Sequence, residues 1–390
     1  MRDALPPPAA PAEVPIIALS DPDITAAECD SVTQALASPA LSAGPGVGAF
    51  EDAFAASLGR RHAIAVTSGS AALWLLLRAM GIGAGDEVVA APFSFRGCVD
   101  AVRLAGARPV FADVDYWSGT LAPEKAAARI SAATRAILAV NVNGHPADWT
   151  GLRALAARHG LPLIEDSSEA IGSRHRGALV GTFGDASIFD FSQPSPVISG
   201  EGGMVVTDDD ALARTIRQLR GGGSGRARRS GGPALGIAMS DLAAALACAQ
   251  LRRLPEILEK RRRVELFYRA KVRSFEGIKD PYVAPDATEV HWFLYVVHLG
   301  TRFSRASRDA IIDDLAVAGI EAAPYCRPLS PGPSGAPPDS VRECPVMAKV
   351  ADRALALPFH THLDADRVAF IVETMKDSSV NVGAGAAIYL

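Results

Sequence analysis

Short apolar runs alternate with longer Ala/Leu-rich stretches along the first two thirds of the chain. Helical patterns occur at Ala71–Met80, Gly97–Leu104 and Leu152–His159. Because strands that alternate with helices usually pair in parallel and are covered on both faces, the pattern predicts an α/β domain around a mostly parallel sheet. The predicted strands are Ala63–Thr67, Glu87–Ala90, Arg108–Asp113, Ala136–Val142, Leu161–Glu165, Ala186–Phe189 and Gly203–Thr207.

The pattern changes after residue 240. A long helical run from Ser240 to about Val272 precedes an apolar strand at His291–Leu299 and helices at Arg305–Val317 and Asp364–Lys376. This order predicts a smaller C-terminal α+β domain. The predicted division is a flexible N-terminal arm at 1–15, a large α/β domain at 16–255 and a small domain at 256–390.

Composition narrows the class of protein. The 390 residues are 49% hydrophobic and carry a net charge of −4, which gives no electrostatic case for nucleic acid or an anionic membrane. No apolar run approaches the roughly 20 residues of a membrane span, and the start lacks the build of a signal peptide. The five cysteines include no CxxC pair, so no metal site is expected. We expect a cytoplasmic protein that acts on a small molecule.

Three segments carry candidate chemistry. Thr67–Leu73 (TSGSAAL) ends a strand and opens a helix, where backbone N–H groups and the helix dipole favour an anion. Asp166 ends an apolar strand, at the edge of the sheet where ligands of open α/β sheets bind. The basic, Gly-rich stretch Gly221–Gly232 is either a surface loop or a lid that meets an anionic ligand.

Taken in order, the segments of this chain resemble the DegT/DnrJ/EryC1/StrS family of fold-type-I aminotransferases, which make amino sugars. The resemblance runs from about Leu41 to about Met375 and includes Ala43–Gly59, Gly85–Phe95 and Gly319–Leu329. It implies a large domain with a seven-stranded, mostly parallel sheet and a smaller C-terminal domain. It also implies a homodimer, because active sites in this family are built across the subunit interface.

The resemblance assigns cofactor roles residue by residue. Gly69 and Ser70 would lie under the phosphate of pyridoxal phosphate, and Phe95 would stack on its ring. Asp166 would pair with the ring nitrogen, and Glu169 stands where the family usually has a Gln near the ring hydroxyl.

The chain departs from the family where the reactive lysine is expected. The family reads roughly GDxxxFSFHPTKxxxxGEGG, and here the interval GDASIFDFSQPSPVISGEGG aligns without a gap and places Ser195 in the lysine column. No lysine lies between Lys125 and Lys260. A lysine amine forms the Schiff base with the cofactor and then moves the substrate proton, which a serine hydroxyl cannot do without an activating base.

Two further departures affect the phosphate. Asp190 replaces the serine that usually contacts it, and a carboxylate about 4 Å from a phosphate costs on the order of several kcal/mol. Gly236 and Ala238 replace the Asn and Arg of a segment that reaches the neighbouring subunit's phosphate.

Three hypotheses follow. The first is a biosynthetic enzyme acting on a keto-sugar or a specialised metabolite with non-covalent pyridoxamine or pyridoxal phosphate, for which His145 and His175 are candidate bases. The second is a cofactor-free enzyme that reuses the cleft, with Asp190 and Ser195 as the leading catalytic candidates. The third is a non-catalytic partner of an active homologue. Ordinary transamination is excluded in all three.

Overall fold

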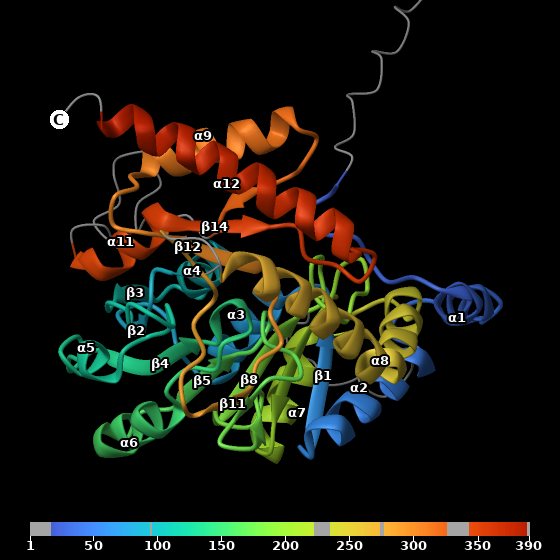
Figure 1. Cartoon of the computed structure of the whole chain (residues 1–390). Helices are drawn as coiled ribbons and strands as arrows, with labels where there is room; N and C mark the ends of the chain where they lie inside the picture. The colour runs from blue at the N-terminus through green and yellow to red at the C-terminus, as the bar shows by residue number, and fades with distance from the viewer. Residues whose placement is uncertain (1–16, 94–95, 222–234, 274–276, 326–342, 388–390) are drawn as a thin grey trace, which may run out of the picture.

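A seven-stranded sheet forms the centre of the structure (Figure 1). The computed structural model describes residues 17–93, 96–221, 235–273, 277–325 and 343–387. The strand order is β1-β9-β8-β5-β4-β2-β3, and all neighbours are parallel except that β9 runs antiparallel to β1 and β8. The strands are β1 His62–Val66, β2 Glu87–Ala90, β3 Arg108–Phe111, β4 Thr134–Val140, β5 Leu163–Asp166, β8 Ala186–Asp190 and β9 Gly203–Thr207.

Helices cover both faces of this sheet. On one face, Leu73, Val102 and Ile216 join strand residues in a buried apolar cluster. On the other, Phe50 and Phe54 pack edge to face against Phe189 and Phe191. The helices of this part are α1 Ala26–Leu36, α2 Pro45–Leu58, α3 Gly69–Ala79, α4 Arg96–Leu104, α5 Pro123–Ala127, the short η1 Val142–Gly144, α6 Trp149–His159 and α7 Asp210–Arg220.

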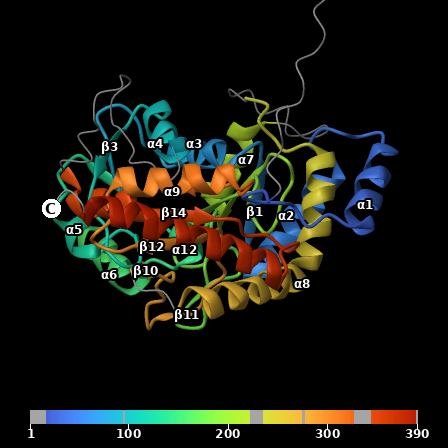
Figure 2. The ribbon, with the colours of Figure 1, turned by 45° about the horizontal axis from the view of Figure 1, so that its top comes forward.

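A second layer lies above the large sheet in Figure 1. The long helix α8 (Asp241–Val272) leads to an antiparallel sheet of order β10-β12-β14-β13, and α9 and α12 lie side by side over it (Figure 2). These elements are β10 Ile278–Lys279, β12 Tyr295–Leu299, β13 Ala323–Pro324, β14 Ala354–Leu357, α9 Arg305–Val317, α11 Pro345–Arg353 and α12 Ala365–Ala387. A small third sheet joins β6 Arg174–His175, β7 Ala178–Leu179 and β11 Ala287–Glu289.

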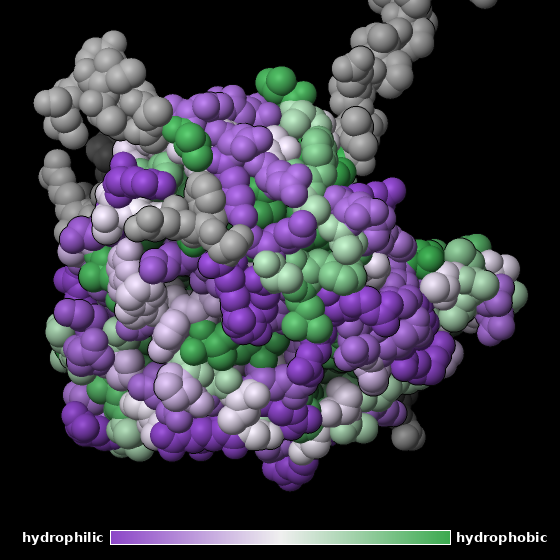
Figure 3. Space-filling model, in the orientation of Figure 1, coloured by the Kyte–Doolittle hydropathy of each residue, from purple (hydrophilic) through white to green (hydrophobic). Residues whose placement is uncertain are grey.

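The two layers share one apolar core. Val89 and Ile137 of the large sheet belong to the same buried cluster as Tyr295 of β12 and Ile371 of α12. Figure 3 shows hydrophilic and hydrophobic residues interspersed over the outer face. Within the described part of the chain, no helix is long and apolar enough to cross a membrane.

The predicted α/β architecture with a seven-stranded, mostly parallel sheet is confirmed. The predicted strand at His291–Leu299 is too long, since β12 begins at Tyr295. The N–H of Leu294 instead donates to Oδ1 of Asn143 at 3.0 Å, which turns this segment towards the large sheet. Helix α12 continues past the predicted end at Lys376. The division at residue 255 stays a prediction, and α8 runs through that residue without a break.

Two predicted segments lie outside the described residues. These are the N-terminal arm and the Gly-rich stretch after Gly221.

Candidate functional site

The N-terminus of α3 lies at the edge of the sheet formed by the ends of β8 and β5. Ser68 caps the helix, with its hydroxyl accepting from the N–H of Ala71 at 3.2 Å. Gly203 of β9 makes the close approach possible, because a Cβ there would lie 2.3 Å from the carbonyl carbon and oxygen of Ser68. The first N–H groups of any helix lack partners within the helix, and the helix dipole favours an anion at this end.

Asp190 supplies that anion from within the chain. Its carboxylate, at the end of β8, accepts a hydrogen bond from the N–H of Gly69 at 2.7 Å through Oδ2. Its Oδ1 accepts from the N–H of Ser192 at 2.8 Å and from the Ser192 hydroxyl. The side chain fits closely, because a Cβ on Gly69 would lie 2.8 Å from Oδ2. The anion position at this helix end is therefore filled by a carboxylate.

Asp166 lies buried on the neighbouring strand β5. Its Oδ1 accepts from the N–H and hydroxyl of Ser168 at 3.0 and 2.6 Å, and the Cys98 thiol donates to Oδ2 at 3.1 Å. Burial raises the pKa of Asp166, and the charge of Asp190 adds to the rise against the lowering effect of these hydrogen bonds. Like charges on adjacent strands favour the protonated form of one of them.

Glu169 follows Asp166 on the next turn and joins the two layers. Its Oε2 accepts from the N–H of Asn143 at 2.6 Å and from the hydroxyl of Tyr325, which follows β13. The Tyr325 ring in turn meets Phe93 edge to face at 5.7 Å. Burial raises the pKa of Glu169 to about 7, against the lowering effect of the Tyr325 and Asn143 bonds. A carboxyl group with this pKa can hold or release a proton near neutral pH.

Ser195 lies apart from Asp166 and Glu169, in a narrow crevice of about 20 Å³. It is 7% exposed, and its Oγ accepts from the N–H of Val197 at 3.2 Å. His360 lines the same crevice, and neither ring nitrogen has a hydrogen-bond partner among the described residues. Burial lowers the pKa of His360 to about 4, so the ring is neutral near pH 7.

None of the six lysines lines this crevice. Lys260 comes close through Asp23, a crevice residue whose Oδ2 lies 3.0 Å from the lysine Nζ. A second carboxylate, on Glu256, lies 2.7 Å from the same Nζ. Hydrogen bonds to these two acids raise the pKa of Lys260 and keep the amine protonated. The remaining lysines are Lys125 on α5, Lys271 on α8, Lys279 on β10, Lys349 on α11 and Lys376 on α12.

The structure separates several predicted site residues. Gly69 and Asp190 are in contact, while Ser70 faces Gly97 of α4, where a Cβ would lie 2.1 Å from the Ser70 Oγ. Phe95 lies outside the described residues. His145 and His175 line another cavity, of about 360 Å³, which Ser195 does not border. Among the described residues no group of three or more His, Cys, Asp and Glu could hold a metal ion.

Sequence reasoning missed three residues of this region. Cys98 lies in α4, Tyr325 directly follows β13 and His360 lies in the segment after β14, and all three are far along the chain from their neighbours. No spacing rule links such residues, because only tertiary packing brings them together. The alternation of apolar residues around them was the one feature of the sequence that pointed to these residues, and it indicated only that they are buried.

Comparison with known proteins gives consistent matches over nearly the whole chain. The model of the DegT/DnrJ/EryC1/StrS aminotransferase family matches residues 22–376. A GDP-perosamine synthase of Caulobacter vibrioides is 37% identical over 81% of this chain and 86% of its own length. The spore coat polysaccharide biosynthesis protein SpsC of Bacillus subtilis is 33% identical over 90% of this chain and 94% of its own.

Solved structures agree with this match. The aminotransferase TlmJ from Streptoalloteichus hindustanus superposes with a TM-score of 0.85 at 28% identity, covering 94% of this chain and 99% of TlmJ. A 3-amino-5-hydroxybenzoic acid synthase superposes with a TM-score of 0.86 at 26% identity, covering 95% of this chain and 100% of its own.

Proposed function

The chain belongs to the DegT/DnrJ/EryC1/StrS aminotransferase family, and from that premise we propose that it modifies a sugar or specialised-metabolite intermediate without lysine-dependent transamination. The named relatives include a perosamine synthase and a spore polysaccharide protein, which support a biosynthetic setting. The family implies pyridoxal phosphate as cofactor, so the residues present must be tested against that group.

The residues around Ser195 do not fit a covalently held cofactor. In our proposal Ser195 occupies the position of the Schiff-base lysine, and its hydroxyl cannot form the imine bond to the cofactor aldehyde. The neighbouring Lys260 is protonated between Asp23 and Glu256, and a protonated amine is no nucleophile.

The observation that carries the proposal is the hydrogen bond from Gly69 to Asp190. A cofactor phosphate at this helix end would have to displace the Asp190 carboxylate and then sit beside its negative charge. Two such charges about 4 Å apart repel by roughly 4 kcal/mol per unit charge pair at the dielectric typical of partly exposed sites. This arrangement favours the cofactor-free hypothesis over non-covalent binding of pyridoxamine or pyridoxal phosphate.

We assign acid–base chemistry to Glu169. Its carboxylate takes the proton from the carbon next to a ketone of the substrate, leaving an enolate, and returns a proton to the same or the adjacent carbon. The Tyr325 hydroxyl, which donates to Glu169, can turn its hydrogen bond to the ketone oxygen as charge develops there. These two proton transfers need no oxidant and no amino donor. Asp190 has a positioning role in this proposal, because it holds α3.

A homodimer is part of the proposal. Helix α1 projects from the body of the molecule, and Leu36 at its end is 58% exposed (Figures 1 and 3). Leu41, which follows the helix, is 40% exposed. Exposed apolar side chains on a projecting element favour burial against a second copy. Cytoplasmic localisation rests on the sequence and stays a prediction.

Hydrogen exchange at the substrate tests the reaction. GDP-linked keto-sugars are incubated with the protein in heavy water, without added cofactor or amino acid, and followed by NMR. The proposal expects deuterium to enter next to the ketone, and Glu169→Gln to slow this at least tenfold. The matched control is Glu201→Gln at an exposed position, which should leave the rate of deuterium incorporation unchanged. Amino transfer from glutamate would overturn the proposal, and absence of both exchange and transfer would favour the non-catalytic partner.

A further inference from the structure

Asn143 connects the two layers of the molecule at Glu169. It lies in the short helix η1 with a φ of 50°, a left-handed conformation that Asn adopts more readily than most residues. Its backbone N–H donates to Glu169 at 2.6 Å, and its side-chain Oδ1 accepts from the N–H of Leu294 at 3.0 Å. Its carbonyl accepts from the N–H of Phe293 at 3.4 Å. Asn143 is therefore fixed to the segment before β12 on one side and to Glu169 on the other.

The side-chain amide nitrogen of Asn143 is left without a partner. Because Leu294 supplies an N–H, the amide atom that faces it is the oxygen, and Nδ2 faces away from Leu294. This nitrogen makes no hydrogen bond within the described part of the chain, although Asn143 is only 6% exposed. The ring nitrogens of His360 also lack partners, but they are fully buried, whereas the Asn143 nitrogen is not. A ligand oxygen would satisfy this donor.

The unpaired amide belongs to a residue that lines a small crevice. Its volume is about 30 Å³, and Tyr325, the other partner of Glu169, lines it as well. A space of this size holds about one water-sized group, so a single oxygen atom of a ligand fits and a sugar ring does not. Phe93 and Val142 belong to its apolar wall. Hydrogen bonds are electrostatically stronger in such surroundings than in water.

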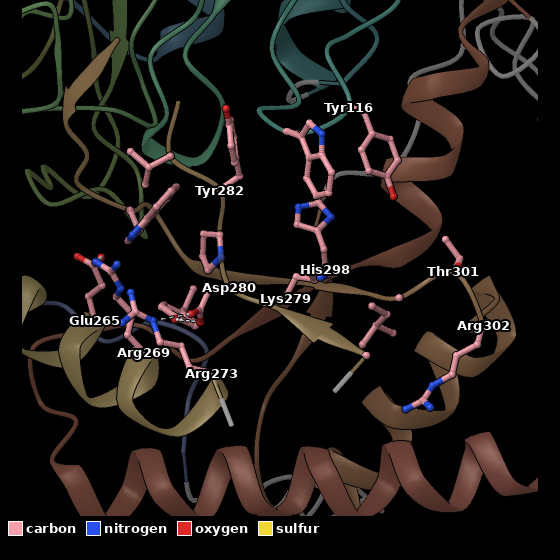
Figure 4. Close-up of a pocket in the computed structure, with 18 residues that line it drawn as sticks. Tyr116, Glu265, Arg269, Arg273, Lys279, Asp280, Tyr282, His298, Thr301 and Arg302 are labelled. Atoms are coloured by element: carbon pink, nitrogen blue, oxygen red, sulfur yellow. Dashed lines mark hydrogen bonds and ion pairs between the residues drawn. The ribbon is translucent and has the colours of Figure 1, made fainter. Parts of the chain in front are cut away.

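The crevice adjoins a larger cavity of about 720 Å³ between the two layers. The residues that line both are Trp117, Pro281, Tyr282, Trp292 and His298. Figure 4 shows Tyr282 and His298 at the larger cavity. A molecule in the larger cavity can therefore place one protruding group in the crevice, against Asn143 and Tyr325.

We propose that Asn143 is a further catalytic residue, which binds the ketone oxygen of the substrate through its side-chain amide N–H. This role rests on the reaction proposed above, in which Glu169 takes the proton next to the ketone. As the negative charge of the enolate develops on that oxygen, the Asn143 amide and the Tyr325 hydroxyl donate to it. When Tyr325 turns towards the substrate, the backbone N–H of Asn143 still binds the Glu169 carboxylate. No bond forms or breaks beyond the proton transfers assigned to Glu169.

Two substitutions separate the amide donor from the rest of the residue. Asn143→Asp keeps an oxygen for Leu294 and removes the amide nitrogen, and Asn143→Gly removes the side chain while tolerating the observed φ. Both keep the backbone N–H that binds Glu169. We expect each to slow deuterium incorporation next to the ketone at least tenfold. Asn381→Asp, at an exposed position on α12, is the matched control and should leave this rate unchanged.

The carbonyl stretch of the bound substrate gives a readout that needs no turnover. Glu169→Gln is saturated with a keto-sugar carrying ¹³C at the ketone carbon, and isotope-edited infrared difference spectra record the C=O frequency. A hydrogen bond from Asn143 lowers this frequency, so we expect it to rise when Asn143→Asp or Asn143→Gly is added. Circular dichroism of each variant establishes that it is folded.

The two readouts distinguish this role of Asn143 from the reaction assigned to Glu169. A C=O frequency that is the same with and without the Asn143 amide would overturn the role of Asn143, whatever the exchange rates. Deuterium exchange that stays at the wild-type rate in both Asn143 variants would overturn it as well and leave the reaction of Glu169 intact. A frequency that depends on Asn143, in a protein whose wild type exchanges no deuterium, would support ketone binding by Asn143 and overturn the reaction.

Discussion

Three carboxyl groups at the sheet edge differ because their surroundings differ. Asp190 meets the N–H of Gly69 at a helix N-terminus, where negative charge is stabilised. Asp166 is buried and Glu169 is partly buried, and burial raises the pKa of both. A carboxyl group therefore serves as an internal anion at Asp190, and as a proton store at Asp166 on the adjacent strand and at Glu169, which follows that strand. A sequence shows only that the acids are present, because the helix end and the burial arise from tertiary packing.

The stability of the protein should depend on pH through Glu169. Its folded pKa of about 7 lies above the ordinary value of 4.5, so the folded state favours the protonated acid. The Glu169 carboxyl stabilises the folded state fully at low pH, and this stabilisation is lost as pH rises from about 4.5 through 7. We expect the wild type to lose about 3 kcal/mol relative to Glu169→Gln across this window. Urea unfolding at four pH values measures the free energy of unfolding of both proteins. A difference between wild type and Glu169→Gln that does not change with pH would contradict this prediction.

At the scale of elements, local patterns predicted the sheet well and its surroundings less well. Strands β2 and β9 have the predicted bounds, because each is a short apolar run enclosed on both faces. The segment before Tyr295 has the same composition, yet its backbone binds Asn143 in place of a strand neighbour. The contact between Gly69 and Asp190 spans 121 residues, so no spacing could reveal it.

Helix α1 is fastened to α8 by a buried ionic cluster. Arg253 binds Asp23 at 2.7 Å and Glu28 at 2.8 Å, and Lys260, further along α8, also binds Asp23. Burial alone would raise the pKa of Asp23 and Glu28, but bonds from Arg253, together with Lys260 and Thr25, hold both at about 2.

Removal of Arg253 should therefore leave two buried acids without their main partner. We expect Arg253→Ala to lower the free energy of unfolding by about 3 kcal/mol or more. The adjacent exposed Arg252→Ala should change it by less than about 0.5 kcal/mol. Urea unfolding at neutral pH compares the two. Equal losses in both variants would show that the cluster does not stabilise the α1–α8 contact.

At the scale of the whole molecule, the candidate site is built where two layers meet. Glu169 follows β5 of the large sheet and Tyr325 follows β13 of the small one, and one apolar cluster continues between the two layers. The fold is that of an aminotransferase. In our proposal the groups that would hold its cofactor differ. Fold and family could be predicted from the order of segments. The filled anion position could not, because it depends on how β8 meets α3.

The proposed homodimer makes a prediction at the same scale. Sedimentation equilibrium should give twice the chain mass at micromolar concentration. Replacing Leu36 and Leu41 by Glu should shift the protein towards the monomer, since both side chains are exposed in the single chain. Matched replacement of Val317, which is 90% exposed at the end of α9, is the control. A monomeric wild type would contradict the assembly.

In our proposal Asp190 fills the position of a cofactor phosphate, and a paired titration with and without the phosphate group examines this. Pyridoxamine phosphate and pyridoxamine are titrated calorimetrically into the wild type, Asp190→Ser and the uncharged near-isostere Asp190→Asn. We expect no phosphate-dependent binding to the wild type at millimolar concentration, and a gain of at least tenfold in Asp190→Ser for the phosphorylated ligand alone. Tight phosphate-dependent binding to the wild type, unchanged by Asp190→Ser, would contradict it.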